Sequence, residues 1–201
     1  MQRPIVHLSF LLWCLPGILQ AQGSAALIEA LQEGGQVVVM RHASSPNQPP
    51  DAAQRRSDNV DGERQLDARG RETASAMGEA LRRLEIAFSE VLVSPTYRAQ
   101  ETARLLGMSD LRVTEELSNE GMRDATAERA AWLRAEVVRV PDGGNHLLIT
   151  HQPNIRAAFA DLEGLDDVED GEALIFAPDG GEEPVLKGRI KIEEWQAFER
   201  R

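Results

Sequence analysis

The stretch Gln36-Val37-Val38-Val39-Met40-Arg41-His42-Ala43 decides how the rest of the chain is interpreted. Its apolar run lies between Gly34-Gly35 and the Ser/Pro/Asn-rich residues 44–50, a pattern typical of a buried strand that opens into a loop. We therefore expect Arg41 and His42 at the carboxyl end of a strand. The pattern recurs at His146-Leu147-Leu148-Ile149-Thr150-His151, where a second apolar strand ends in a histidine.

Helical and strand patterns alternate through most of the chain. Apolar residues at three- and four-residue spacing predict helices, for which Ser24, Asp67 and Ser94 are candidate N-caps. Helices are expected at 24–33, 67–84, 95–106, 126–140 and 153–159, short strands at 91–93 and 111–114, and a hairpin at 173–190. This alternation predicts an α/β fold in which a mostly parallel sheet is sandwiched between helices, with a C-terminal hairpin.

The N-terminus has the pattern of a secretory signal peptide. Arg3 precedes an apolar run from Ile5 to Ile18 and small residues near Ala21-Gln22-Gly23. We expect residues 1–23 to be a signal peptide and 24–201 to be a single domain that is periplasmic or secreted. An uncleaved anchor is the alternative, although the run is shorter than the ~20 residues that span a membrane. Cys14, the only cysteine, lies in this leader.

The formal net charge of -11 limits the partners of the chain. An acidic surface repels duplex nucleic acid and anionic membranes. We therefore expect no nucleic-acid partner and no stable membrane association once the leader is cleaved. An anionic ligand would need a local positive pocket within this acidic body.

Basic side chains converge where the strands are predicted to end. Ligands of open parallel sheets bind in a crevice at the carboxyl ends of the strands. Because Arg41, His42 and His151 lie at such ends and Arg98 lies in the helix after another strand, we expect all four to face one crevice. Two arginines, two imidazoles and a helix N-terminus suit a phosphate group. A neutral imidazole can also attack phosphorus, while arginines stabilise the equatorial charge and a carboxylic acid protonates the leaving group.

No metal site is expected, because the odd spacing of His146 and His151 places them on opposite faces of one strand.

Three ordered segments resemble a known family. Arg41-His42-Ala43, residues 94–103 (SPTYRAQETA) and Thr150-His151-Gln152-Pro153-Asn154 resemble the motifs of the histidine phosphatase, or phosphoglycerate mutase-like, superfamily. Arg64-Gln65-Leu66-Asp67, with Gly70, resembles the segment between the first two motifs. The resemblance covers about Val37 to Asn154, and Gly171–Leu174 is similar to members with a compact, cap-free body.

The resemblance implies roles for individual residues. His42 would be the nucleophile, Arg41 and Arg98 would bind the phosphoryl oxygens, and His151 would donate to them and stabilise the transition state. Ala43 replaces a usual Gly, a change tolerated by a loop with negative φ. Gln152 replaces the Gly common after the second histidine and is not the proton-donating Asp of the phytase-like branch.

The proton donor is left open among three possibilities. Glu120 is the nearest match to the acid of the mutase-like branch, Glu172 is a second candidate, and a member with no dedicated donor is the third. The loop residues Arg55, Arg56 and Arg64 either extend the positive pocket or are solvated beside nearby aspartates.

The implied function is a metal-independent phosphomonoester hydrolase of the histidine acid phosphatase type. It would need no cofactor and would act through a phosphohistidine on a phosphorylated small molecule or an envelope saccharide. The alternatives are a phosphomutase and a non-catalytic phosphate-binding protein with the same pocket.

Overall fold

The structure is a computed structural model that describes residues 16–46, 63–119 and 126–198, with the backbone alone for 16–22. Its helices are α1 (Pro16–Glu33), α2 (Ala68–Arg83), α3 (Tyr97–Leu105), α4 (Ala127–Val138) and α5 (Gln152–Ala158), with 3₁₀ helices η3 (Glu115–Leu117) and η4 (Ile192–Ala197). Its strands are β1 (Val37–Arg41), β2 (Phe88–Val93), β3 (Arg112–Val113), β4 (Asn145–Thr150), β5 (Ala173–Phe176) and β6 (Leu186–Ile190). None of the described helices is long and apolar enough to cross a membrane.

The strands form one sheet in the order β3-β2-β4-β1-β5-β6. The pairs β1–β4, β2–β4 and β2–β3 are parallel, whereas β5 is antiparallel to β1 and β6. The sheet is therefore mostly parallel and closes with a C-terminal hairpin, as the sequence predicts. Arg41 lies opposite Thr150 in the β1–β4 pair, so His42 and His151 follow neighbouring strands at one edge of the sheet.

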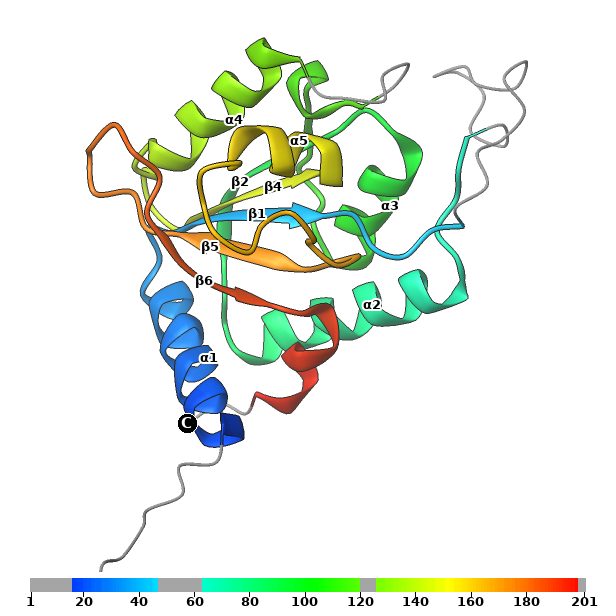
Figure 1. The fold of residues 1–201 in the computed structure, drawn as a ribbon. Helices are drawn as coiled ribbons and strands as arrows, with labels where there is room; N and C mark the ends of the chain where they lie inside the picture. Colours follow the sequence, from blue (N-terminus) through cyan, green and yellow to red (C-terminus); the bar gives the residue numbers. More distant parts are fainter. Residues whose placement is uncertain (1–15, 47–62, 120–125, 199–201) are drawn as a thin grey trace, which may run out of the picture.

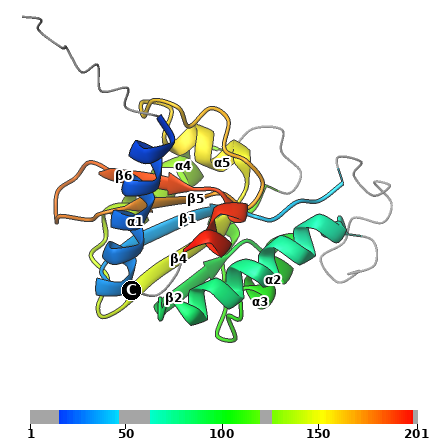
Figure 2. The same cartoon turned by 90° about the horizontal axis from the view of Figure 1, so that it is seen from below.

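Helices cover both faces of this sheet (Figure 1). Alternate side chains of a strand point to opposite faces, and β1 has no exposed apolar side chain on either. Val38 and Met40 belong to the core formed with residues of α1, α2, α3 and η4. In Figure 2, which shows the fold from below, α1 and η4 lie in front of the sheet. Val37 and Val39 pack in a second core with α4 and α5. Burial on both faces explains why β1 is a continuous apolar run.

Two of the predicted helix starts are wrong. Helix α1 begins at Pro16, so Ser24 lies inside the helix and is not its cap. Helix α3 begins at Tyr97 with Thr96 as N-cap, because Ser94 Oγ instead lies 2.8 Å from His151 Nε2. The Asp67 cap of α2 is confirmed, since its side chain accepts a hydrogen bond from the Gly70 N–H. The signal peptide stays a prediction.

The N-terminus of α2 is fixed to the loop that follows His42. Ser44 Oγ donates to Asp67 Oδ2 at 2.7 Å, and the Asp67 N–H donates to Ser44 O at 3.1 Å. A Cβ at Gly70 would lie 2.1 Å from Ser44 O. Glycine is therefore required here for close backbone contact, although it is a weak helix former.

Gly70→Ala tests this contact. Alanine normally stabilises a helix interior by about 1 kcal/mol, but here we expect a loss of about 1–3 kcal/mol because the methyl group overlaps the Ser44 backbone. Denaturant unfolding of Gly70→Ala beside the exposed Glu72→Ala of the same helix measures it. An unchanged or raised midpoint for Gly70→Ala would contradict the packing described here.

Candidate active site

Two buried histidines meet at the carboxyl edge of the sheet. His42 is 3% exposed and His151 is 1% exposed. Their ring centroids lie 5.1 Å apart in an edge-to-face arrangement. The structure thus brings together the two histidines that the sequence places at the ends of β1 and β4.

Arg98, in the first turn of α3, links the two imidazoles. Its Nε–H donates to His42 Nε2 at 3.2 Å, and its Nη2 lies 3.1 Å from His151 Nδ1. Nη2 also donates to Asn119 Oδ1 at 2.8 Å. One guanidinium group therefore fixes both rings, as expected if Arg98 belongs to the pocket and not to the solvated surface.

These contacts select the tautomer of each ring. His42 Nδ1 lies 2.8 Å from Ala43 O, which can only accept, so the proton is on Nδ1 and Nε2 carries a free lone pair. His151 Nδ1 faces Arg98, which can only donate, so the proton of His151 is on Nε2 and points to Ser94 Oγ. The Nε2 of His42 consequently carries a lone pair that faces Arg98.

Burial and nearby positive charge keep both rings neutral. Desolvation, together with the charges of Arg98, Arg64 and Arg41, lowers the pKa of His42 well below its ordinary value, against the opposing effect of the Ala43 carbonyl. Desolvation and the neighbouring His42 and Arg98 lower the pKa of His151 in the same direction. An uncharged imidazole is the form that can attack phosphorus.

Arg64 joins the site, and the sequence alone did not decide between a pocket and a loop position for it. Its Nη2 lies 3.4 Å from His42 Nε2, and it lies a few residues before the Asp67 cap. The Nε atoms of Arg64 and Arg41 are buried and have no acceptor among the described residues. Buried donors without acceptors are uncommon in proteins, so this place fits an anion that supplies several oxygens.

Arg41 is held by the loop between α5 and β5. Its Nη1 donates to Val168 O at 2.7 Å, and its Nη2 forms an ion pair of 2.6 Å with Asp170. Gln152 fixes that loop, because its amide donates to Asp166 O at 2.6 Å and accepts from the Val168 N–H at 3.2 Å. Gln152, one of the two departures from the family motifs, thus positions the loop that holds Arg41.

Polar side chains tie the site segments together. Thr102 Oγ1 accepts from the Ala43 N–H at 3.1 Å and donates to Arg98 O at 2.7 Å. Asn154 Nδ2 donates to Leu117 O at 3.0 Å, which places the segment that carries Asn119. Ala43 adopts an ordinary negative φ, because Glu85 is the one non-glycine residue with positive φ in the described ranges.

The sequence predicts that the N-terminus of α3 helps to bind an anionic ligand, but in the structure a protein side chain already contacts it. The Tyr97 N–H donates to Glu63 Oε2 at 2.5 Å, so a protein carboxylate occupies this position. Glu63 is 8% exposed. No motif identified this residue, and its only signal in the sequence was its place directly before Arg64.

The two named candidates for the proton donor have different outcomes. Glu120 lies outside the described residues. Glu172 is fully buried, and its oxygens accept from Arg189 Nε at 2.5 Å, from Arg189 Nη2 at 2.6 Å and from the Glu169 N–H at 2.9 Å. This geometry gives Glu172 a structural role as the partner of Arg189.

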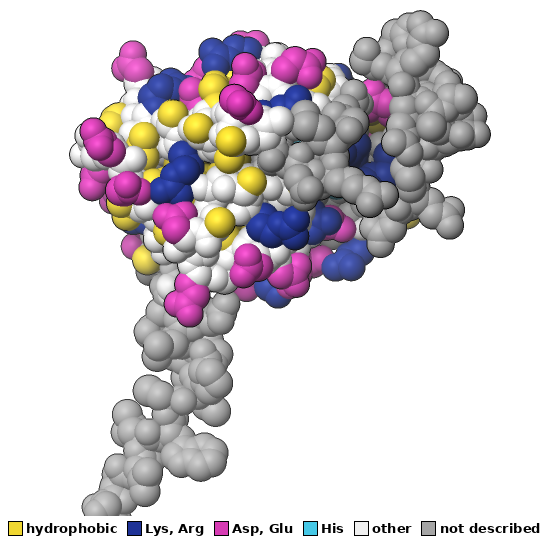
Figure 3. Space-filling view, turned by 45° about the horizontal axis from the view of Figure 1, so that its top comes forward, with side chains coloured by type: hydrophobic (Ala, Val, Ile, Leu, Met, Phe, Trp, Pro, Cys, Tyr) yellow, Lys and Arg dark blue, Asp and Glu magenta, His cyan; other side chains and the backbone are white. Residues whose placement is uncertain are grey.

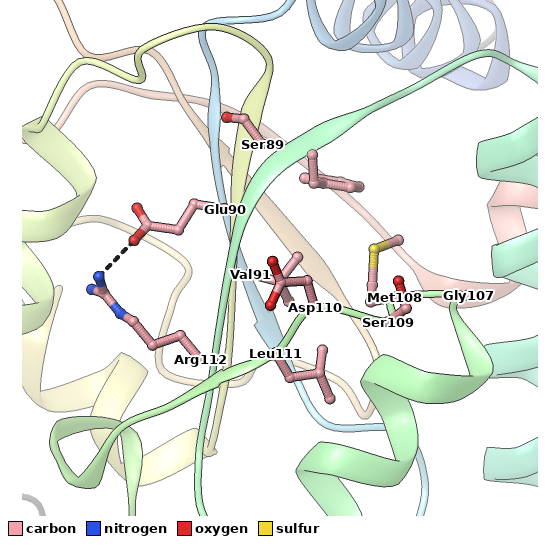
Figure 4. Close-up of a pocket in the computed structure, with 10 residues that line it drawn as sticks. Ser89, Glu90, Val91, Gly107, Met108, Ser109, Asp110, Leu111 and Arg112 are labelled. Carbon is pink, nitrogen blue, oxygen red and sulfur yellow. Dashed lines mark ion pairs between the residues drawn. The ribbon is translucent and has the colours of Figure 1, made fainter.

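Other features of the described surface lack the chemistry of this site. In those ranges no three His, Cys, Asp or Glu side chains gather as metal ligands. A cavity of about 620 Å³ lies along Phe88–Val91 and Gly107–Arg112, with the Glu90–Arg112 ion pair at one side (Figure 4). Acidic and basic side chains are interspersed on the face shown in Figure 3. The arginines beside His42 therefore remain the place best suited to a phosphate group.

Comparison with known proteins agrees with the motifs. Residues 37–123 match the family model of the histidine phosphatase superfamily (branch 1). A search of curated proteins finds no match. This match covers the first two motifs in order, so residues 37–123 are similar to the histidine phosphatase superfamily, and the solved structures below share the fold.

Solved structures share this fold. The protein histidine phosphatase SixA, complexed with tungstate, has a TM-score of 0.59 and 24% identity, over 79% of this chain and 98% of that one. A phosphoserine phosphatase mutant from Entamoeba histolytica has a TM-score of 0.56 and 12% identity, over 79% and 98%. An Escherichia coli putative alpha-ribazole-5'-P phosphatase has a TM-score of 0.54 and 18% identity, over 76% and 94%.

The lowered pKa of His42 predicts the pH range of activity. Because protonation removes the Nε2 lone pair, and the lowered pKa delays protonation to more acidic pH, kcat/KM should persist below the ordinary histidine pKa of about 6.5. The check is to record kcat/KM against pH with two phosphomonoesters that differ in their second pKa. This separates ionisation of the enzyme from ionisation of the substrate. If kcat/KM instead fell on the acidic side with an enzyme pKa at or above ~6.5, a neutral buried His42 would be contradicted.

Proposed function

We propose that this chain is a phosphomonoesterase of the histidine acid phosphatase type, with His42 as its nucleophile. The observation that carries the proposal is the state of His42: a buried, neutral ring whose Nε2 lone pair faces Arg98 and Arg64. The family-model match of residues 37–123 and the phosphatase names of the structural neighbours support the same reaction class.

The reaction proceeds in two transfers. A bound phosphoryl group takes over the donors that now face His42 Nε2, and the freed lone pair attacks phosphorus as the bond to the leaving oxygen breaks. Arg98, Arg64 and Arg41 stabilise the charge on the phosphoryl oxygens. Water then attacks phosphorus, the P–N bond breaks, and one water proton passes to solvent. Inorganic phosphate leaves and His42 returns to its neutral form.

His151 has a different part from His42. In the structure its Nδ1 accepts from Arg98 and its Nε2–H faces Ser94. A phosphoryl dianion beside the ring raises the pKa of His151, because negative charge stabilises the imidazolium. Protonation at Nδ1 then lets His151 donate to a phosphoryl oxygen, which is the role that the family resemblance implies.

The leaving oxygen needs a proton when it is an alkoxide. The described residues place no carboxylate within hydrogen-bond distance of either imidazole. Glu120 follows Asn119, whose side chain already contacts Arg98. We therefore assign Glu120 as the donor, with solvent as the source for leaving groups that are stable as anions.

The substrate and the compartment are parts of the same proposal. The signal peptide predicted at residues 1–23 supports export, and export favours sugar phosphates and envelope saccharide phosphates over cytoplasmic phosphoproteins. The local positive charge at Arg41, Arg64 and Arg98 within a chain of net charge -11 supports a phosphorylated substrate of modest size.

Phosphate release from p-nitrophenyl phosphate in EDTA tests the central step. Wild-type turnover should survive chelation because guanidinium groups supply the stabilising charge, and His42→Ala should lose it by several orders of magnitude. His146→Ala is the matched control, because His146 lies at the opposite end of β4. Equal activity in His42→Ala and wild type would refute the proposal, and phosphate binding without turnover would favour the binding-protein alternative.

Glu120→Gln separates a proton donor from a solvated loop acid. General acid catalysis contributes about 100-fold or more, so kcat on an alkyl phosphate should fall about 100-fold. Hydrolysis of p-nitrophenyl phosphate should barely change, because p-nitrophenolate leaves without a proton. The neighbouring exposed Glu115→Gln should alter neither rate. Equal losses on both substrates would rule out the donor role of Glu120.

A further inference from the structure

A polar cleft of about 270 Å³ adjoins the candidate active site through Arg41. Arg41 and Ser44, which flank His42 in the sequence, form one side of it. Arg69 and Thr73 of α2 and the loop residues Asp167 and Asp170 form other parts of its lining. The cleft therefore lies beside the place where a phosphoryl group would contact Arg41.

The charges that line this cleft are almost all paired. Arg41 pairs with Asp170, Arg69 pairs with Glu193, and Glu169 pairs with Lys191. Asp167 also lines the cleft, is exposed, and adds a carboxylate to these balanced pairs. The lining thus holds two arginines and four carboxylates, and with Lys191, which pairs with Glu169 from outside the lining, one negative charge is left over. It differs from the positive group at His42.

Such a lining discriminates between leaving groups by their charge. A carboxylate on the leaving group would face the negative excess and would have to compete with Asp170 and Glu193 for their arginines. Hydroxyl groups can donate to the carboxylates and accept from guanidinium groups without disturbing these pairs. Thr73 and Ser44 add hydroxyl groups to the same surface.

The size of the cleft agrees with a small ligand. Pockets for drug-sized molecules have volumes of roughly 300–1,000 Å³, and this cleft is just below that range. It is polar and compact, which suits one hydrophilic ring better than a nucleotide or a peptide.

We propose that this cleft is the leaving-group subsite and that it selects a neutral, hydroxyl-rich group such as a single sugar ring. The proposal rests on the phosphomonoesterase function above and assigns its specificity. The phosphoryl group binds Arg41, Arg64 and Arg98, and the sugar hydroxyls bind Asp167 and Thr73. Asp167 is then a substrate-binding residue that takes no part in attack at phosphorus.

Kinetics on matched substrates test the subsite in the full chain. Wild type should have a kcat/KM for glucose phosphate about tenfold or more above that for phosphoglycerate, since one hydrogen bond to a charged group corresponds to about that factor. Asp167→Asn should lose about tenfold on glucose phosphate, mainly through KM, and Asp167→Lys should shift the preference toward phosphoglycerate. On p-nitrophenyl phosphate, whose leaving group has no hydroxyl group for Asp167, either variant should change kcat/KM less than on glucose phosphate. Asp142→Asn, exposed in the turn before β4, is the control.

Each other outcome overturns the proposal. A wild-type preference for phosphoglycerate or for phosphoethanolamine would show a subsite for a charged group. Equal losses on all substrates, or no loss on glucose phosphate, would remove Asp167 from a binding role. Failure of wild type to hydrolyse even p-nitrophenyl phosphate would refute the phosphatase function itself, a result distinct from a change in selectivity.

Discussion

The guanidinium group of Arg98 is the interaction on which the candidate site depends. It donates to one imidazole, contacts the other and binds Asn119, all from a side chain that is 9% exposed. Burying a positive charge between two histidines is favourable only while both rings are neutral. The same contact therefore orients the rings, suppresses their protonation and leaves a strong positive charge ready for an anion.

The fold supplies this contact through the arrangement of its strands. Because β1 and β4 are parallel neighbours in register, His42 and His151 leave the sheet side by side. Helix α3, which follows β2 on the other side of β4, brings Arg98 to them. Thr102 and Asn154 then bind backbone groups of the flanking loops, so that small polar side chains hold the charged ones in place.

Sequence reasoning identified the residues whose signal is local. A buried strand ending in a histidine is visible in a few adjacent letters, and so are Arg98, the Asp67 cap and the C-terminal hairpin. The missed features depend on contacts between distant segments. Ser94 has the sequence pattern of an N-cap, but in the fold its hydroxyl group contacts His151. Glu63 lies far from Tyr97 in the sequence and contacts it only in the folded chain. Glu172 resembled a free acid because its partner Arg189 lies on the next strand. Arg64 was indistinguishable from other loop arginines for the same reason.

The most direct test of this account is nitrogen-15 NMR of the histidine rings in the unliganded protein at neutral pH. We expect two neutral rings in opposite tautomers: His42 with its proton on Nδ1, and His151 with its proton on Nε2. Arg98→Ala should release the tautomer of His151, whose Nδ1 faces that guanidinium group, whereas the Ala43 carbonyl should keep the proton of His42 on Nδ1. A protonated ring, or a proton on His42 Nε2 in the wild-type protein, would contradict the account, because the nucleophilic lone pair would then be absent.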